Sequence, residues 1–173
     1  MTENKMAENR MQEIRIEKVT LNIGAGKNED QLKKGLKLLE KLTQSTPVKT
    51  ATRKRIPGWG LRPGLIIGCK VTRRKNAEEL LKRLLTAKKN ILSADSVDKQ
   101  GNFSFGIPEY IDIPGLEYDP ELKILGLEVA VTLERPGFSL KRRKIKPGRV
   151  GKGHRIRKED ALRFIRQLGV EVQ

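Results

Sequence analysis

The chain has 173 residues with 37 Lys and Arg against 21 Asp and Glu, a formal net charge of +16. This length predicts one domain, and the 36% of hydrophobic residues suffices for one modest core. Cys69 and His154 are the only cysteine and histidine, so the composition excludes an internal disulfide and a His/Cys metal site. No apolar run is long enough to span a membrane and the first residues do not resemble a signal peptide, so we expect a cytoplasmic protein.

The positive charge is concentrated in two segments that contain no acidic residue. Residues 49–75 hold nine bases and residues 141–158 hold ten, so the rest of the chain is slightly acidic. Such segments indicate a polyanionic partner, because each Lys or Arg on a phosphate releases condensed counterions. Gly and Pro interrupt both segments, which argues against a basic amphipathic helix on a membrane. Nucleic acid is therefore the expected partner.

The first half of the chain reads as strand, helix and strand. Residues 1–12 are polar and aperiodic, which predicts a flexible N-terminal arm before a single domain over residues 13–173. Residues 14–23 alternate as in a half-buried strand. A glycine turn and a helix follow and end before Pro47. The polar side of the strand carries Lys18, Thr20 and Asn22.

A basic loop between two strands comes next. Residues 47–52 predict a short strand, and residues 53–64 form a loop rich in Gly, Pro and Arg. Residues 65–74 predict a strand with Lys70, Thr72 and Arg74 on its polar side.

The next helix is predicted from its cap and its apolar stripe. Asn76-Ala77-Glu78-Glu79 resembles a capping box, and the stripe runs from Leu80 to Leu92.

The second half predicts two more strands and a closing helix. Turn residues precede an extended segment at 103–107, and residues 125–134 alternate most clearly of all. Between these two segments, residues 109–121 hold five acids and no base. Glu128 and Glu134 share one side of the last strand, so we expect this strand to lie away from a phosphate-binding surface.

This order of elements predicts an α+β fold. We expect a two-layer sandwich, with helices on one face of a largely antiparallel sheet and with a basic loop and a basic tail segment. The uncovered face of the sheet carries the polar side chains named above and is the candidate binding surface.

Several motifs have ordinary structural explanations. Gly24-Ala25-Gly26-Lys27 lacks the residues of a nucleotide-binding loop and predicts a tight turn. Phe103 and Phe105 predict core packing, as does Cys69. Trp59 lies between glycines in the basic loop and is a candidate for stacking on a base.

Five short segments together resemble the ribosomal protein L5 family of the large subunit in its archaeal and eukaryotic form. The similarity extends from about Arg10 to Val170. The segments are Ile16-Glu17-Lys18-Val19-Thr20-Leu21-Asn22-Ile23-Gly24, Ile67-Gly68-Cys69-Lys70-Val71-Thr72, Gly101-Asn102-Phe103-Ser104-Phe105-Gly106, Glu117-Tyr118-Asp119-Pro120 and Arg135-Pro136-Gly137.

The resemblance implies a structural protein that binds 5S rRNA and large-subunit rRNA and reaches the P-site tRNA through a loop. The expected 5S rRNA-binding residues are Lys18, Thr20, Asn22, Ser45, Thr46, Lys49, Lys70, Thr72 and Arg74. The expected tRNA-facing residues are Arg53, Lys54, Arg55, Gly58, Trp59, Gly60 and Arg62. Basic tail residues, which we expect on rRNA, are Lys141, Arg142, Arg143, Lys144, Lys146 and Arg149.

The family resemblance also implies protein neighbours, including a small-subunit protein that the acidic segment could contact. It implies no cofactor, no metal, no membrane and no enzymatic activity. One departure concerns the family pattern Gly-Gln-x-Pro, where this chain reads Gln44-Ser45-Thr46-Pro47. Ser45 stands where the RNA-contacting Gln is expected, so we expect weaker binding at that point.

The sequence alone leaves two alternative functions open. One is an RNA-processing enzyme or ribosome-assembly factor that uses the carboxylates with a metal. The other is a nonspecific nucleic-acid-binding or DNA-compacting protein. No expected helix carries the basic stripe of a major-groove reader.

Overall fold

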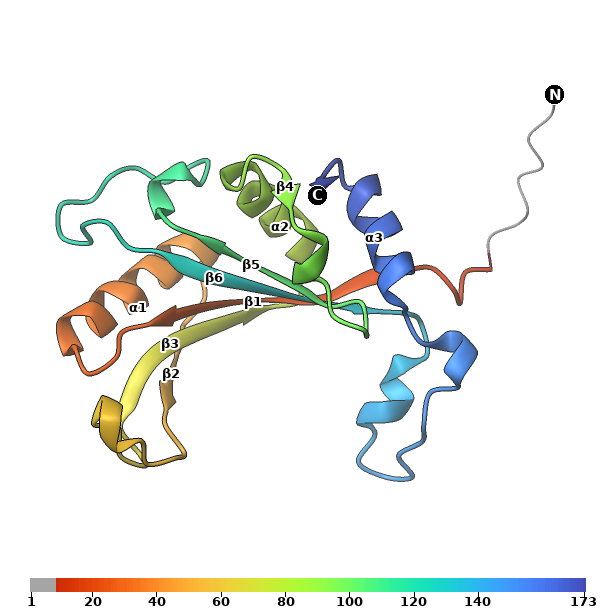
Figure 1. Cartoon of the computed structure of the whole chain (residues 1–173), viewed down its shortest axis with the longest axis horizontal. Helices are drawn as coiled ribbons and strands as arrows, with labels where there is room; N and C mark the ends of the chain where they lie inside the picture. Colours follow the sequence, from red (N-terminus) through yellow and green to blue (C-terminus); the bar gives the residue numbers. More distant parts are fainter. Residues whose placement is uncertain (1–8) are drawn as a thin grey trace.

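The computed structural model describes residues 9–173, in which three helices lie on one side of a five-stranded sheet (Figure 1). The strand order is β2-β3-β1-β6-β5, and every neighbouring pair is antiparallel. This confirms the predicted α+β sandwich. The predicted arm falls mostly on residues 1–8, which lie outside the described residues. The strands are β1 (Arg15–Gly24), β2 (Val48–Ala51), β3 (Ile66–Arg73), β5 (Phe103–Ile107) and β6 (Leu127–Glu134).

The helices form where the apolar residues recur at helical spacing. Asn28 caps α1, since its Oδ1 accepts hydrogen bonds from the backbone N–H groups of Asp30 and Gln31. Gly26, at φ +58, makes the tight turn before this cap. The helices are α1 (Glu29–Thr43), α2 (Ala77–Ala87) and α3 (Lys158–Gln167). Short 3₁₀ turns are η1 (Pro57–Trp59), η2 (Ala94–Ser96), η3 (Tyr110–Asp112), η4 (Phe138–Arg142) and η5 (Lys152–His154).

Two details around α2 differ from the sequence prediction. Asn76 has a left-handed conformation, and its side chain makes no capping hydrogen bond, so the predicted capping box is wrong. The helix ends at Ala87, because the chain reverses through Lys89 and Asn90 at φ +58 and +56. The last two residues of the predicted stripe instead form β4 (Ile91–Leu92), which pairs in parallel with β7 (Glu171–Val172). A short apolar run does not by itself distinguish a helix end from a strand.

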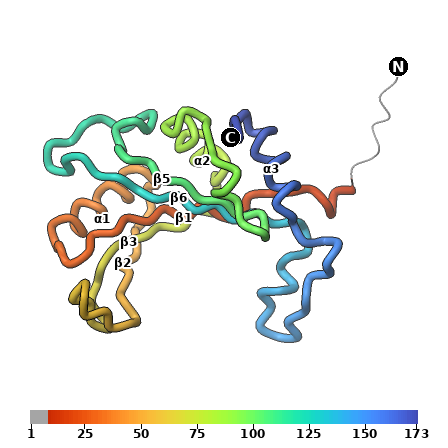
Figure 2. Tube along the Cα trace, viewed as in Figure 1, coloured from red at the N-terminus to blue at the C-terminus, as the bar shows by residue number. Residues whose placement is uncertain are grey.

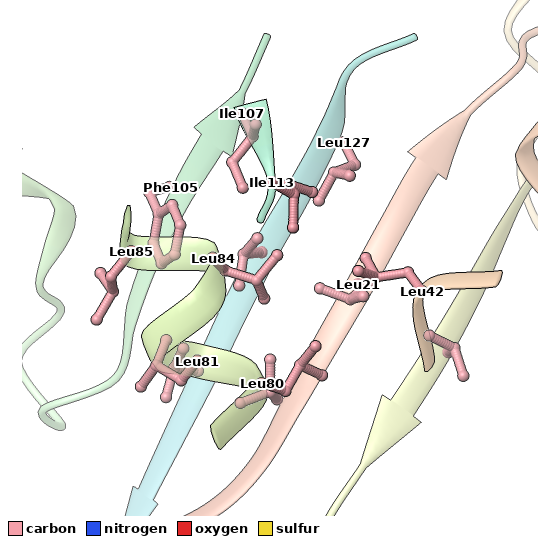
Figure 3. Packing of buried hydrophobic residues seen from close by; sticks show 14 of the residues in the cluster. Leu21, Leu42, Leu80, Leu81, Leu84, Leu85, Phe105, Ile107, Ile113 and Leu127 are labelled. Atoms are coloured by element: carbon pink, nitrogen blue, oxygen red, sulfur yellow. The ribbon is translucent and has the colours of Figure 1, made fainter. Parts of the chain in front are cut away.

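The hydrophobic core lies between the sheet and the helices. Side chains of α1 pack on β3 and β1, and those of α2 pack on β1. Figure 3 shows Leu81 and Leu84 of α2 above the strands, with Phe105 and Ile107 of β5 in the same layer. Cys69 is fully buried in this core, as predicted, and burial raises the pKa of its thiol to about 11. The helices therefore cover one face of the sheet and leave the other to polar residues.

Gln44 ends α1 in an unfavourable backbone conformation. It has φ +51, and its N–H donates to the Glu40 carbonyl at 2.8 Å. Glycine adopts this left-handed conformation without steric cost. We expect Gln44→Gly to raise the free energy of unfolding by about 1 kcal/mol in urea titrations. Glu40→Gly, within the same helix, is the matched control and should lower the free energy of unfolding by a similar amount. A loss of stability in both variants would contradict the prediction.

Candidate nucleic-acid interface

Polar side chains from neighbouring strands form rows across the face of the sheet opposite the helices, which we call the open face. Residues directly opposite each other in an antiparallel pair project to the same side. Thr20 pairs with Thr72 on β3 and with Ala130 on β6. Asn22 pairs with Lys70 on β3 in the adjacent row. Small hydroxyl and methyl groups thus occupy the middle of the open face, with the lysine beside them.

The structure brings together six of the nine residues predicted to bind 5S rRNA. Five lie on the open face, and Arg74 follows β3 directly and is exposed. The five are Lys18, Thr20, Asn22, Lys70 and Thr72.

The other three predicted residues lie at the β2 edge rather than on the open face. Lys49 pairs with Cys69, whose side chain is buried on the helix side, so Lys49 projects to that side. Ser45 and Thr46 lie in the link between α1 and β2, where Ser45 Oγ accepts a hydrogen bond of 2.6 Å from the Arg73 guanidinium. A bound RNA that contacted all nine residues would have to wrap around this edge.

The two acid-free segments lie at opposite ends of the sheet. In Figure 1 the loop of residues 53–64 hangs from the β2–β3 end, and the segment from η4 to η5 hangs from the other end. Both project away from the helix layer. The open face is therefore flanked by positive charge at both ends, an arrangement that suits a polyanion lying across the sheet.

The basic loop is a tight structure that exposes an aromatic ring. Ile56 and Leu61 form a β-bridge around η1, and Gly60 reverses the chain at φ +60. A Cβ atom on Gly60 would collide with the Lys27 side chain, which lies against the loop. Trp59 is 72% exposed at the tip. The predicted tRNA-facing residues Arg53, Lys54, Arg55, Gly58 and Arg62 are exposed around it.

The basic tail is held to the body of the protein near both ends. Arg142 pairs with Glu17 on β1 and with Glu134 on β6. Arg135 donates to Asp160 Oδ2 at 3.1 Å and to the carbonyls of His154 and Arg155. The side chain of Arg142 is thus already paired with carboxylates, whereas the other predicted tail contacts are exposed: Lys141, Arg143, Lys144, Lys146 and Arg149.

One expectation about the open face is wrong. Strand β6 does not lie away from the candidate surface but pairs directly with β1. Glu128 lies opposite Asn22, and its Oε2 accepts a 3.1 Å hydrogen bond from the Asn22 amide. The sequence pattern showed which side of β6 carries Glu128, but strand order depends on long-range pairing that alternation does not encode.

The acidic segment contacts α1. Lys37 donates to Glu121 at 2.7 Å, and Lys41 donates to Asp119. The Lys41 hydrogen bond, followed by the Glu121 backbone N–H, lowers the pKa of the Asp119 carboxyl. Arg83 of α2 also donates to the Pro114 carbonyl at 2.8 Å. Within residues 9–173, no group of three or more His, Cys, Asp or Glu side chains is arranged to hold a metal, and no helix is long and apolar enough to cross a membrane.

Two models of one protein family match most of this chain. The family model of ribosomal protein L5 matches residues 9–62, and the model of the C-terminus of the same ribosomal family matches residues 66–168. The chain belongs to the ribosomal protein L5 family. It is therefore a structural, non-enzymatic component of the ribosome, which excludes the enzyme alternative.

Individual relatives agree with this assignment over nearly their whole length. The large ribosomal subunit protein uL5 of Nanoarchaeum equitans is 51% identical over 162 residues, covering 92% of this chain and 95% of that protein. The same-named proteins of Methanococcus vannielii and Sulfurisphaera tokodaii are 46% and 47% identical. They cover 91% and 92% of this chain and 90% and 91% of their own lengths. The L5 fold and its ribosomal location in the cytoplasm thus extend to this chain.

Proposed function

We propose that this L5-family chain binds 5S rRNA across the open face and anchors it in the central protuberance of the large subunit. The observation that carries the proposal is the row of small side chains across β3, β1 and β6, with the hydroxyl groups of Thr72 and Thr20 in it, flanked at both ends by acid-free basic segments. A flat face with hydroxyl and amide groups suits ribose and base edges, whereas the basic segments suit phosphates.

The test is a binding titration of the purified chain with 5S rRNA, against tRNA and a scrambled RNA as competitors. We expect a clear preference for 5S rRNA that survives moderate salt. Each phosphate contact adds about 0.7 to 0.9 to the log–log salt slope. Equal affinity for all three RNAs and for duplex DNA, lost together as salt rises, would support the nonspecific nucleic-acid alternative instead.

The basic loop is proposed to contact the P-site tRNA. Trp59 is exposed at its tip, as a stacking residue must be. We expect Trp59→Ala to lower the affinity of the protein for tRNA about tenfold, in line with the stacking energy of one base. Its affinity for 5S rRNA should be unchanged, because the loop hangs beyond the sheet.

Trp59→Phe is the matched control for this prediction, since it keeps an aromatic face. It should retain most of the tRNA affinity. If Trp59→Ala weakened 5S rRNA and tRNA binding equally, the loop would not be a separate tRNA contact.

The remaining proposed partners are large-subunit rRNA at the basic tail and neighbouring ribosomal proteins. A basic small-subunit protein suits the acidic segment, where Glu117 and Tyr118 are exposed beside the Lys41–Asp119 pair. This contact would use the carboxylates that α1 does not already pair.

A further inference from the structure

The open face ends in a cleft that is lined by an acidic side chain, Glu128, which phosphate binding does not explain. The cleft has a volume of about 590 Å³ and lies where β1 and β5 end and β6 begins. Asn22, Glu128 and Lys88 are among the residues that line it. A carboxylate beside a phosphate costs binding energy by like-charge repulsion. The repulsion between Glu128 and the RNA therefore has to be offset by a contact that a phosphate cannot make.

The hydrogen bond between Asn22 and Glu128 determines what the cleft presents. Asn22 donates one amide N–H to Glu128 Oε2, which leaves its carboxamide oxygen as an acceptor and its second N–H as a donor. The carboxylate is acceptor-only when ionised, and its second oxygen lies beside the first. The pair thus offers mainly acceptor oxygens to its ligand, with one N–H of Asn22 beside them. In RNA the matching donors are the N–H groups on base edges and the ribose 2′-hydroxyl.

The walls of the cleft suit a flat ring rather than a single hydroxyl. Gly24 and Gly106 line it, and a Cβ atom on either would meet nothing within 4 Å. Pro108, which is exposed, adds apolar surface, whereas Ile23, Ile107 and Leu127 reach the cleft only with their edges because they are buried in the core. The space next to the carboxylate is therefore open, with an apolar side chain and bare glycine backbone around it, which leaves room for a flat ring.

We propose that this cleft takes an unpaired guanine of the bound RNA, with Glu128 accepting from its N1–H and N2–H groups and Asn22 holding the carboxylate in place. Guanine is the base whose Watson–Crick edge presents two adjacent N–H donors, which match the two oxygens of a carboxylate. Lys88 can then neutralise the phosphate of a flanking nucleotide. Glu128 makes the open face selective, because it favours this base and disfavours a phosphate placed there.

The inference rests on the proposed function, and Glu128→Gln tests it with full-length protein and 5S rRNA. The substitution removes one negative charge, so affinity for the scrambled RNA should rise slightly. Affinity for 5S rRNA should fall about tenfold, which is the discrimination expected of one bidentate contact. Glu171→Gln on β7 is the matched control for charge, because Glu171 is exposed in the second sheet.

Gly106→Val tests whether the RNA needs the open space of the cleft, and it does so without removing a charge. Gly106 lies on β5 opposite Glu128, and valine favours a strand, so the variant should fold at least as stably. Its side chain would fill the cleft and lower 5S rRNA affinity, and Gly106→Ala should have a smaller effect. Unfolding curves of both variants check the fold.

Kethoxal footprinting identifies the base, because kethoxal modifies N1 and N2 of unpaired guanine. We expect the wild-type protein to protect an unpaired guanine that becomes reactive in complexes with Glu128→Gln or Gly106→Val. Unchanged protection, or an equal rise in affinity for all RNAs with Glu128→Gln, would overturn the inference. A wild-type protein without preference for 5S rRNA would instead overturn the proposed function.

Discussion

Thr20→Asp is expected to lower the affinity for 5S rRNA about a hundredfold. Thr20 is half-buried in the central strand of the sheet, between Thr72 and Ala130. A carboxylate there faces the bound phosphates and sugars, and like-charge contacts in an interface cost several kcal/mol. About 2.7 kcal/mol corresponds to the hundredfold loss. The measurement is a filter-binding titration at fixed salt.

Thr20→Asn is the matched control, because asparagine has the shape of aspartate without the charge. Both residues are poor strand formers, so any loss of stability should be shared by the two variants. We expect Thr20→Asn to retain most of the affinity. Equal losses for Asp and Asn, or no loss for either, would mean that the RNA does not contact the middle of the open face.

Leu84→Ala is expected to lower the free energy of unfolding by about 2–5 kcal/mol, a large share of the stability of a domain of this size. Leu84 is fully buried, and Figure 3 shows it between α2 and the strands, with Ile113 close by. Removal of its side chain leaves a cavity in the layer that supports β1. Urea denaturation measures the change.

The control for this prediction is Leu84→Met, which nearly conserves the side-chain volume and should lower the free energy of unfolding by less than about 1.5 kcal/mol. Because α2 lies on the side of the sheet away from the open face, the folded fraction of Leu84→Ala should bind 5S rRNA normally. A loss of binding at a temperature where the variant is folded would contradict the separation of core and binding surface.

The strands could be predicted from the sequence because each has one buried and one polar side. Residues 127–134 alternate without exception between the two, and the structure has this strand at Leu127–Glu134. The end of α2 could not be predicted in the same way. Ile91 and Leu92 continue the apolar stripe, but their pairing with β7 brings together residues 80 positions apart.

The candidate interface could be predicted only in part from the sequence, because it also depends on pairing between strands that are far apart in the chain. Lys18, Thr20 and Asn22 share a side by alternation alone. Figure 2 shows β3 running beside β1, and the register between the two strands brings the polar residues of β3 next to these three. The role of Glu128 depends on β6 being the other neighbour of β1, which no local pattern indicates. Likewise, the Arg142 pairs with Glu17 and Glu134 join segments that are far apart in the chain or separated by a turn.

Cleavage of 5S rRNA by a probe attached to the protein tests whether the RNA lies across the open face. The native Cys69 is fully buried and its thiol pKa is raised to about 11, so a new surface cysteine can be labelled selectively at neutral pH. Fe(II)–EDTA would be attached at Val48→Cys and Ser104→Cys, on the two edge strands of the open face, and at Glu40→Cys on α1.

If 5S rRNA lies across the open face, hydroxyl radicals from both open-face positions cleave it, in separate segments of the RNA. We expect no cleavage from Glu40→Cys, because α1 lies on the opposite side of the sheet. Strong cleavage from Glu40→Cys, with none from Val48→Cys and Ser104→Cys, would contradict binding across the open face.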